Sequence, residues 1–157
     1  MKKILTTKQG FDKLEKEYNH LKSVERPAII AQIAEARDHG DLKENAEYHS
    51  AREKQSFIEG RIKILDGFFV NSQIIDSKQF SGSKKIFFSA KIELLDIDSD
   101  KQVNYQIVGE FEADLDKGLL SCETPLAIAL LGKEVGDEVF VNTPKGKKNY
   151  EILKISY

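Results

Sequence analysis

Five carboxylates recur at three-residue spacing in one short stretch of the chain. They are Glu35, Asp38, Asp41, Glu44 and Glu47. Carboxylate oxygens are ligands that a hard cation such as Mg²⁺ prefers, and Mg²⁺ requires an octahedral shell. Two acids presented together leave most of that shell open, so such a site would need ligands from another molecule. We interpret residues 38–47 as an acidic tip that completes a metal site supplied from elsewhere.

Helix capping is the alternative explanation for part of this cluster. If Asp41 caps the helix that follows, Glu44 lies at its third position, which is the acidic form of a capping box favoured by the helix dipole. Capping does not explain Glu35 and Asp38, because they lie at the end of the preceding helix, where the dipole disfavours anions. Spacing alone leaves both interpretations of Asp41 and Glu44 open.

Histidines and basic residues surround the acidic tip. His39 and His49 have no cysteine nearby, which disfavours a zinc site and favours exposed polar positions. Arg37 and Arg52 belong to a loose basic set that either balances the acids or guides a nucleic-acid phosphate, a group that the arginine fork suits. Both interpretations of these arginines stay open.

Two helix-period segments must position the tip. In the first, apolar residues follow at steps of three and four, which is typical of a helix packed on one partner. The start of this helix is capped by Thr6 or Thr7, and Thr6 with Gln9 has capping-box spacing. Pro27 predicts a kink or phase shift, and Gly40 predicts the helix end. The apolar residues are Phe11, Leu14, Tyr18, Leu21, Ile29, Ile30 and Ile33.

The second segment has a regular heptad pattern. Its seam residues are Tyr48, Ala51, Gln55, Ile58, Ile62, Leu65 and Phe69. A short loop between two helices makes them antiparallel neighbours, so we expect a coiled-coil hairpin roughly 45 Å long. Half of a four-helix bundle is the alternative, and it is disfavoured because the rest of the chain does not have helical periodicity.

The pattern after residue 71 predicts a second domain. Residues 71–73 and 77–83 resemble a linker, and alternating apolar residues predict strands within 86–94, 103–107, 138–141 and 149–157. Thr124 and Pro125 are predicted to be the cap and the first residue of a short helix that ends at Gly132. The fold class is therefore α+β, with a hairpin domain at 1–76 and a globular domain at 80–157.

Composition excludes several classes of protein. The 157 residues carry a net charge of −2, which argues against duplex DNA binding through a general positive field. The single cysteine, Cys122, excludes an internal disulfide, and its surroundings predict an inert thiol. No apolar run is long enough for a membrane span or a signal peptide. We expect a cytoplasmic monomer without a membrane partner.

Several long motifs resemble the Gre family of bacterial transcript-cleavage factors. The tip motif is GDLKENAEY at 40–48. Flanking motifs are KSVERPAII at 22–30, IAEAR at 33–37, AREK at 51–54 and EGRI at 59–62. The C-terminal half adds Thr124-Pro125, ALLGK at 129–133, Gly136-Asp137, PKG at 144–146 and YEI at 150–152. The resemblance covers nearly the whole chain.

The resemblance implies a coiled-coil hairpin followed by a domain like the FK506-binding proteins. It implies binding to bacterial RNA polymerase, with the hairpin passing through the secondary channel. Asp41 and Glu44 match the two tip carboxylates, which in the family help hold the second Mg²⁺ and the attacking water at the nascent RNA 3′ end of backtracked complexes. The factor then stimulates cleavage by the polymerase. It is expected to be no enzyme alone and to bring no cofactor beyond the polymerase Mg²⁺.

The sequence departs from the family pattern at two points, and two alternative functions stay open. Thr124 stands before Pro125 where many relatives have serine, so the role of this candidate polymerase contact is open. The extended basic patch of one family branch is not evident, which favours action on short backtracked RNA. A prolyl isomerase, suggested by fold analogy only, and a factor that merely plugs the channel are the alternatives. Paired acids at the tip disfavour the plug.

Overall fold

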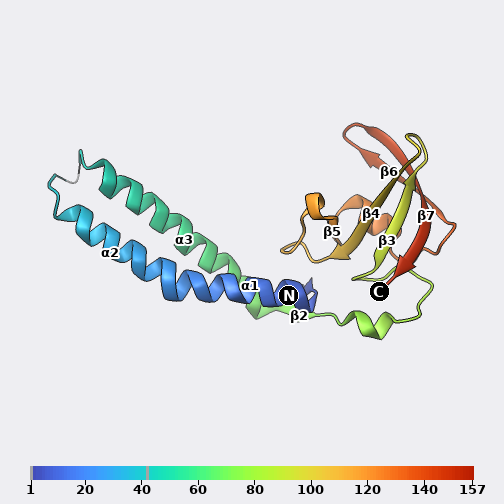
Figure 1. Cartoon of the computed structure of the whole chain (residues 1–157), viewed down its shortest axis with the longest axis horizontal. Coiled ribbons are helices and arrows are strands. Elements are labelled where there is room, and N and C mark those ends of the chain that lie inside the picture. Colours follow the sequence, from blue (N-terminus) through green and yellow to red (C-terminus); the bar gives the residue numbers. More distant parts are fainter. Residues whose placement is uncertain (1, 42) are drawn as a thin grey trace. The chain divides into compact units, whose positions relative to one another are not determined.

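The chain forms two compact units joined in one polypeptide. The computed structural model describes residues 2–41 and 43–157. One unit is Asp12–Asn71, and the other combines the residues up to Phe11 with Ser72–Tyr157 (Figure 1). Within the described ranges, no helix has the length and apolar character needed to cross a membrane.

Three helices build the helical hairpin. They are α1 (Lys8–His20), α2 (Arg26–Arg37) and α3 (Ala46–Asn71), and a π-helical turn at Leu21–Glu25 joins the first two. The π turn lies just before Pro27, so the predicted phase shift is confirmed. The hydroxyl of Thr7 accepts a hydrogen bond from Gly10 N at 3.0 Å, which makes Thr7, and not Thr6, the cap of α1.

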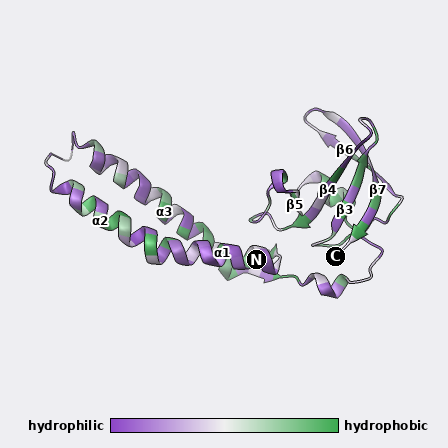
Figure 2. Cartoon of the chain, viewed as in Figure 1, coloured by the Kyte–Doolittle hydropathy of each residue, from purple (hydrophilic) through white to green (hydrophobic). Residues whose placement is uncertain are grey.

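An apolar seam holds the hairpin together, as the heptads predict. Hydrophobic and hydrophilic residues alternate along α2 and α3 (Figure 2). The predicted end of the seam is wrong by one residue, because Phe68 is 1% exposed and Phe69 is only half-buried. Phe69 instead packs against the ring of Tyr18, with centroids 5.1 Å apart. The buried residues are Leu14, Leu21, Ile29, Ile33, Ala36, Ala51, Ile58, Ile62, Leu65 and Phe68.

Paired charges on the surface of the hairpin fix its register. Arg26 donates two hydrogen bonds to Glu59, at 2.7 and 2.8 Å. Arg61 donates two to Glu17, at 3.0 and 2.8 Å. Each pair joins the first half of the hairpin to α3. Such half-exposed pairs contribute little to stability, because solvent screens them, but their fork geometry selects one alignment of the helices.

A five-stranded sheet forms the centre of the second unit. Its order is β5-β4-β3-β7-β6, with β3–β4, β3–β7 and β6–β7 antiparallel and β4–β5 parallel. The strands are β3 (Lys91–Asp96), β4 (Lys101–Val108), β5 (Leu119–Ser121), β6 (Glu138–Thr143) and β7 (Gly146–Ser156). The short helix α4 (Pro125–Leu130) buries Ala127 and Leu130 in the core. The predicted α+β fold class, with a helical hairpin before a sheet, is confirmed.

Two expectations for the segment before β3 are wrong. The predicted strand at 86–94 begins only at Lys91, because the backbone of Ile86 bonds outside the ladder, to Lys133 O at 2.9 Å. The residues read as linker contain β2 (Ser72–Ile74), which pairs in parallel with β1 (Ile4–Thr6), and a 3₁₀ turn at Ser77–Phe80. The partner strand β1 lies almost seventy residues earlier, so a local pattern could not reveal this pairing.

Candidate functional site

The tip loop lies between the end of α2 and the start of α3. The last turn of α2 is closed by hydrogen bonds from Asp38 N to Glu35 O and from His39 N to Ala36 O, both at 3.1 Å. Gly40 then adopts a φ of +124°. Side chains disfavour this conformation, so glycine lets the chain reverse direction here. The predicted helix end at Gly40 is confirmed to within three residues.

The structure excludes the alternative in which Asp41 and Glu44 form a capping box in the free protein. Helix α3 begins at Ala46, and the side chain of Asn45 caps it by accepting a hydrogen bond from Tyr48 N at 3.1 Å. Asparagine and aspartate cap helices about equally well. Spacing alone therefore could not choose between Asp41 and Asn45. The sequence signal that favours Asn45 over Asp41 is its position three residues before Tyr48, where the heptad pattern begins.

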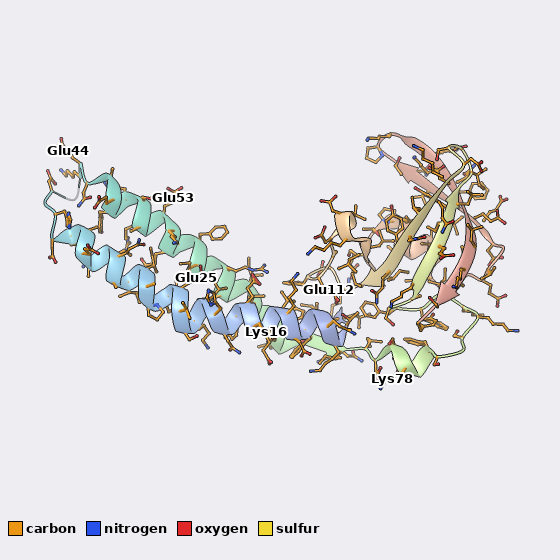
Figure 3. All side chains as sticks on the ribbon, in the orientation of Figure 1. Lys16, Glu25, Glu44, Glu53, Lys78 and Glu112 are labelled. Carbon is orange, nitrogen blue, oxygen red and sulfur yellow. The ribbon has the colours of Figure 1, made fainter. Side chains whose placement is uncertain are left out.

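The two tip acids belong to the loop and are exposed. Figure 3 shows Glu44 at the loop end of the hairpin. Asp41 Oδ1 accepts a hydrogen bond from Lys43 N at 3.0 Å, a local turn that orients the carboxylate. Within the described part of the chain, no other hydrogen bond to the carboxylates of Asp41 and Glu44 is present.

Asp41 and Glu44 do not form a complete metal site by themselves. Among residues 2–41 and 43–157, no group of three or more histidine, cysteine or carboxylate side chains is arranged to hold a metal ion. Asp41 and Glu44 would supply two of the six oxygens that Mg²⁺ requires. The chemistry of this donor set fits a cation that is also held by a second molecule.

The basic residues and histidines near the tip have different surroundings. The guanidinium of Arg37 lies 5.9 Å from the ring centroid of Tyr48, within the range of a cation–π contact. Arg52 donates a long hydrogen bond of 3.4 Å to Gln55. His49 Nε2 lies 3.1 Å from Lys43 O, and since a carbonyl only accepts, this nitrogen is the donor. His49 therefore holds the loop, while a phosphate contact by Arg37 or Arg52 stays a prediction.

A groove runs between α2 and α3 beside the tip. It has a volume of about 580 Å³, and its lining includes the small residues Ala36, Ala46, Ser50 and Ala51. Glu35 and Glu47, which the sequence left without a role, both line it, and Lys54 adds one positive charge. Asp38 is not among its lining residues. The groove therefore brings together two of the five carboxylates of the sequence motif, Glu35 and Glu47.

The second candidate contact lies in the sheet unit. Thr124 caps α4, since its hydroxyl accepts a hydrogen bond from Ala127 N at 3.3 Å and donates one to Ser121 O at 2.7 Å. Pro125 is the exposed first residue of α4, as predicted. Burial, together with the nearby Glu123 carboxylate, raises the pKa of the Cys122 thiol. A protonated thiol is a poor nucleophile, in line with the predicted inert cysteine.

Two family models together cover nearly the whole chain. The model of the N-terminal part of transcription elongation factors matches residues 4–74. The model of the C-terminal part of transcription elongation factors GreA and GreB matches residues 81–157. The two matches include the tip loop and α4 respectively.

Curated relatives match over the full length. The chain is 59% identical over 157 residues to transcription elongation factor GreA of Ruegeria pomeroyi, covering 100% of this chain and 99% of that protein. It is 54% identical to GreA of Alkalilimnicola ehrlichii, with the same coverage. GreA factor homolog 1 of Thermus thermophilus, a crystal structure, is 26% identical over 99% of this chain and 100% of that one, with a TM-score of 0.45.

Proposed function

The chain belongs to the GreA/GreB family of transcription elongation factors, and from this premise we propose how it acts. It binds bacterial RNA polymerase and stimulates the polymerase to cleave the 3′ end of nascent RNA in backtracked complexes. The hairpin enters the secondary channel, and the tip acids reach the active centre. The observation that carries this proposal is the exposed pair Asp41 and Glu44 on the loop that ends a long helical hairpin.

The length of the hairpin supports delivery of the acids into a buried site. Helix α3 has 26 residues. At a rise of about 1.5 Å per residue, a helix of this length forms a rod of about 40 Å. Acids on the surface of the sheet unit would have no comparable reach. The hairpin is therefore the part of this chain best suited to carry carboxylates into a buried active centre.

The chemistry proposed for the acids is that of a shared metal site. Two-metal hydrolysis needs one ion beside the attacking water and one beside the leaving oxygen. The resemblance implies that the first of these ions is held jointly by the polymerase and the factor. Asp41 and Glu44 would hold that Mg²⁺ and orient the water, and the polymerase would supply the other ligands. The factor by itself has no RNA-cleaving activity in this proposal.

The remaining expectations are part of the same proposal. Thr124 and Pro125 contribute to polymerase docking, and Arg37 and Arg52 lie close to the nascent RNA in the complex. The factor works as a cytoplasmic monomer and brings no cofactor beyond the Mg²⁺ of the polymerase. The exposed positions of Pro125, Arg37 and Arg52 support these contacts.

A stalled, backtracked elongation complex with end-labelled RNA tests the proposal. Adding the unaltered chain should release short 3′ fragments in a Mg²⁺-dependent manner. Asp41→Asn keeps an oxygen that can accept from Lys43 N but removes the charge. This variant and Glu44→Gln should reduce the cleavage rate by about 100-fold or more, because each removes a charged ligand from the transition state.

The matched control is Glu53→Gln. It removes one exposed carboxylate from α3, nine positions after Glu44 and farther from the loop (Figure 3). It should stimulate cleavage like the unaltered chain. All three variants should compete with the unaltered chain for polymerase equally well. Full cleavage by the Asp41 or Glu44 variant would contradict the metal-sharing mechanism. No cleavage with the unaltered chain would contradict the function itself.

A further inference from the structure

The side chain of Asn45 connects the two helices that flank the tip loop. Its Nδ2 donates a hydrogen bond of 2.6 Å to Ala36 O, in the last turn of α2. Its Oδ1 accepts the bond from Tyr48 N, in the first turn of α3. Nine residues separate Asn45 from Ala36 along the chain. One amide group therefore closes the whole loop.

Both partners of Asn45 are groups that a helix leaves without an internal bond. The last carbonyls and the first N–H groups of a helix have no partner within it. Ala36 O accepts from His39 N and from Asn45 Nδ2, so both of its lone pairs are used. A serine, threonine or aspartate at position 45 could cap α3, but an ionised aspartate cannot donate and the hydroxyls are shorter. Asparagine combines a donor and an acceptor with the required reach.

The loop inside this closure is bonded at a second point. Lys43 N donates to Asp41 Oδ1 at 3.0 Å, and Lys43 O accepts from His49 Nε2 at 3.1 Å. The peptide backbone on both sides of Lys43 is thus tied to Asp41 and to α3. Glu44 lies between Lys43 and Asn45. Both tip acids are held within a loop whose two ends are fixed to the helices.

We infer that Asn45 is a positioning residue for the cleavage reaction, acting by bonding α2 to α3 across the tip and so fixing Asp41 and Glu44. This inference rests on the proposed function. Metal-assisted hydrolysis depends on placement, since a misplacement of about 1 Å can reduce a rate by about 100-fold. Without the bond from Asn45 to Ala36 O, the loop would be tied by side chains to α3 but not to α2, and the two carboxylates would occupy more arrangements, of which few would bind the same ion.

The variant Asn45→Ser distinguishes the positioning of the tip acids from the capping of α3. Serine is a good helix cap, so the bond from Tyr48 N is retained, but its short hydroxyl does not reach Ala36 O. We expect the maximal cleavage rate at saturating factor to fall about tenfold. The factor concentration for half-maximal cleavage should stay unchanged, and the Mg²⁺ concentration for half-maximal cleavage should rise. Loss of helix stability alone would not raise the Mg²⁺ requirement.

Asn71→Ser is the matched control. It also removes an amide that donates to a backbone carbonyl, Gly67 O at 3.0 Å, but at the opposite end of α3. Its cleavage rate and Mg²⁺ requirement should equal those of the unaltered chain. Asn45→Ser cleavage within twofold of the unaltered chain would overturn the inference and leave the proposed function intact. If Asn45→Ser raised the factor concentration for half-maximal cleavage and left the maximal rate unchanged, the inference would also be overturned, because that result would assign Asn45 to polymerase binding.

Hydrogen exchange in the free protein tests the closure without polymerase. In Asn45→Ser, the amides of His39 and Lys43, which donate to Ala36 O and Asp41 Oδ1, should exchange at least about fivefold faster, while those in the middle of α3 are unchanged, because only the loop loses a bond. Unchanged exchange in the loop would overturn the inference. If exchange changes but the unaltered chain stimulates no cleavage, the proposed function fails although the closure exists.

Discussion

A single carboxylate, Glu112, binds two distant segments of the sheet unit together. It accepts hydrogen bonds from Thr6 Oγ1 at 3.0 Å, from Thr7 N at 2.8 Å and from Gly109 N at 3.2 Å, and also from Thr7 Oγ1. The approach is close, because a Cβ on Gly109 would lie 2.0 Å from Leu5 O. Glu112 therefore anchors the residues that lead into α1 (Figure 3).

Glu112→Gln should weaken this anchor. Glutamine keeps one acceptor oxygen but turns an NH₂ group toward groups that are themselves donors, and it loses the charge that strengthens these bonds. We expect a loss of about 2 kcal/mol in the free energy of unfolding of the sheet unit, measured by urea denaturation, with faster hydrogen exchange at Thr7 N. Glu110→Gln, an exposed carboxylate two positions earlier, is the control. Equal stability of the two variants would show that the anchor contributes little.

At the scale of elements, α3 contains a residue that weakens it. Gly60 lies in the helix interior, and a Cβ there would meet no atom within 4 Å. Glycine lowers helix stability by about 1 kcal/mol relative to alanine. The same element is bounded by a loop in which Gly40 has a φ of +124°. The two glycines therefore have opposite roles.

Alanine substitutions should separate these two roles. Gly60→Ala should stabilise the hairpin by about 0.5–1 kcal/mol, because it reduces the freedom of the unfolded chain at no steric cost. Gly40→Ala should destabilise it by roughly 1 kcal/mol, because the side chain disfavours the positive φ. Thermal unfolding followed by circular dichroism at the helix band measures both. A destabilised Gly60→Ala would mean that α3 does not present open space at this position.

At the scale of the whole molecule, the hairpin acts as a spacer in the proposed function. Deleting residues 30–36 and 51–57 removes one heptad from each helix, preserves the phase of the seam and keeps the tip loop with Asn45 and both acids. Seven residues at about 1.5 Å each withdraw the tip by about 10 Å. We expect cleavage to fall by more than about 100-fold, because the carboxylates no longer reach the ion. The deletion also removes Arg52, so Arg52→Ala in the full-length chain is the control, and it should lose far less cleavage than the shortened chain.

Binding must be measured on the same shortened chain. It should compete with the unaltered factor for polymerase, since the sheet unit with Thr124 and Pro125 is intact. Circular dichroism should show the helix content expected for fourteen fewer helical residues. Undiminished cleavage by this folded, shortened chain would exclude a mechanism that depends on the reach of the hairpin.

Family, fold class, the helices of the hairpin, α4 and the longer strands could be read from the sequence, because they depend on local signals, whereas the short strands β1, β2 and β5 could not. The heptads predicted the hairpin, Pro27 predicted the phase shift that the π turn provides, and Thr124-Pro125 predicted the start of α4. Each of these signals depends on residues within a few positions of one another. The motif around Asp41 and Glu44 likewise identified the tip as the site to examine.

Long-range contacts decided what the sequence left open. Asn45, and not Asp41, caps α3 by accepting from Tyr48 N, and it also donates to Ala36 O, a partner that a capping pattern does not include. The pairing of β1 with β2 and the bonds of Glu112 to Thr6 and Thr7 join residues from opposite parts of the chain. Hydrogen-bond partners distant in sequence leave no periodicity, so only the folded structure shows that the acids are freed from capping and presented by the loop.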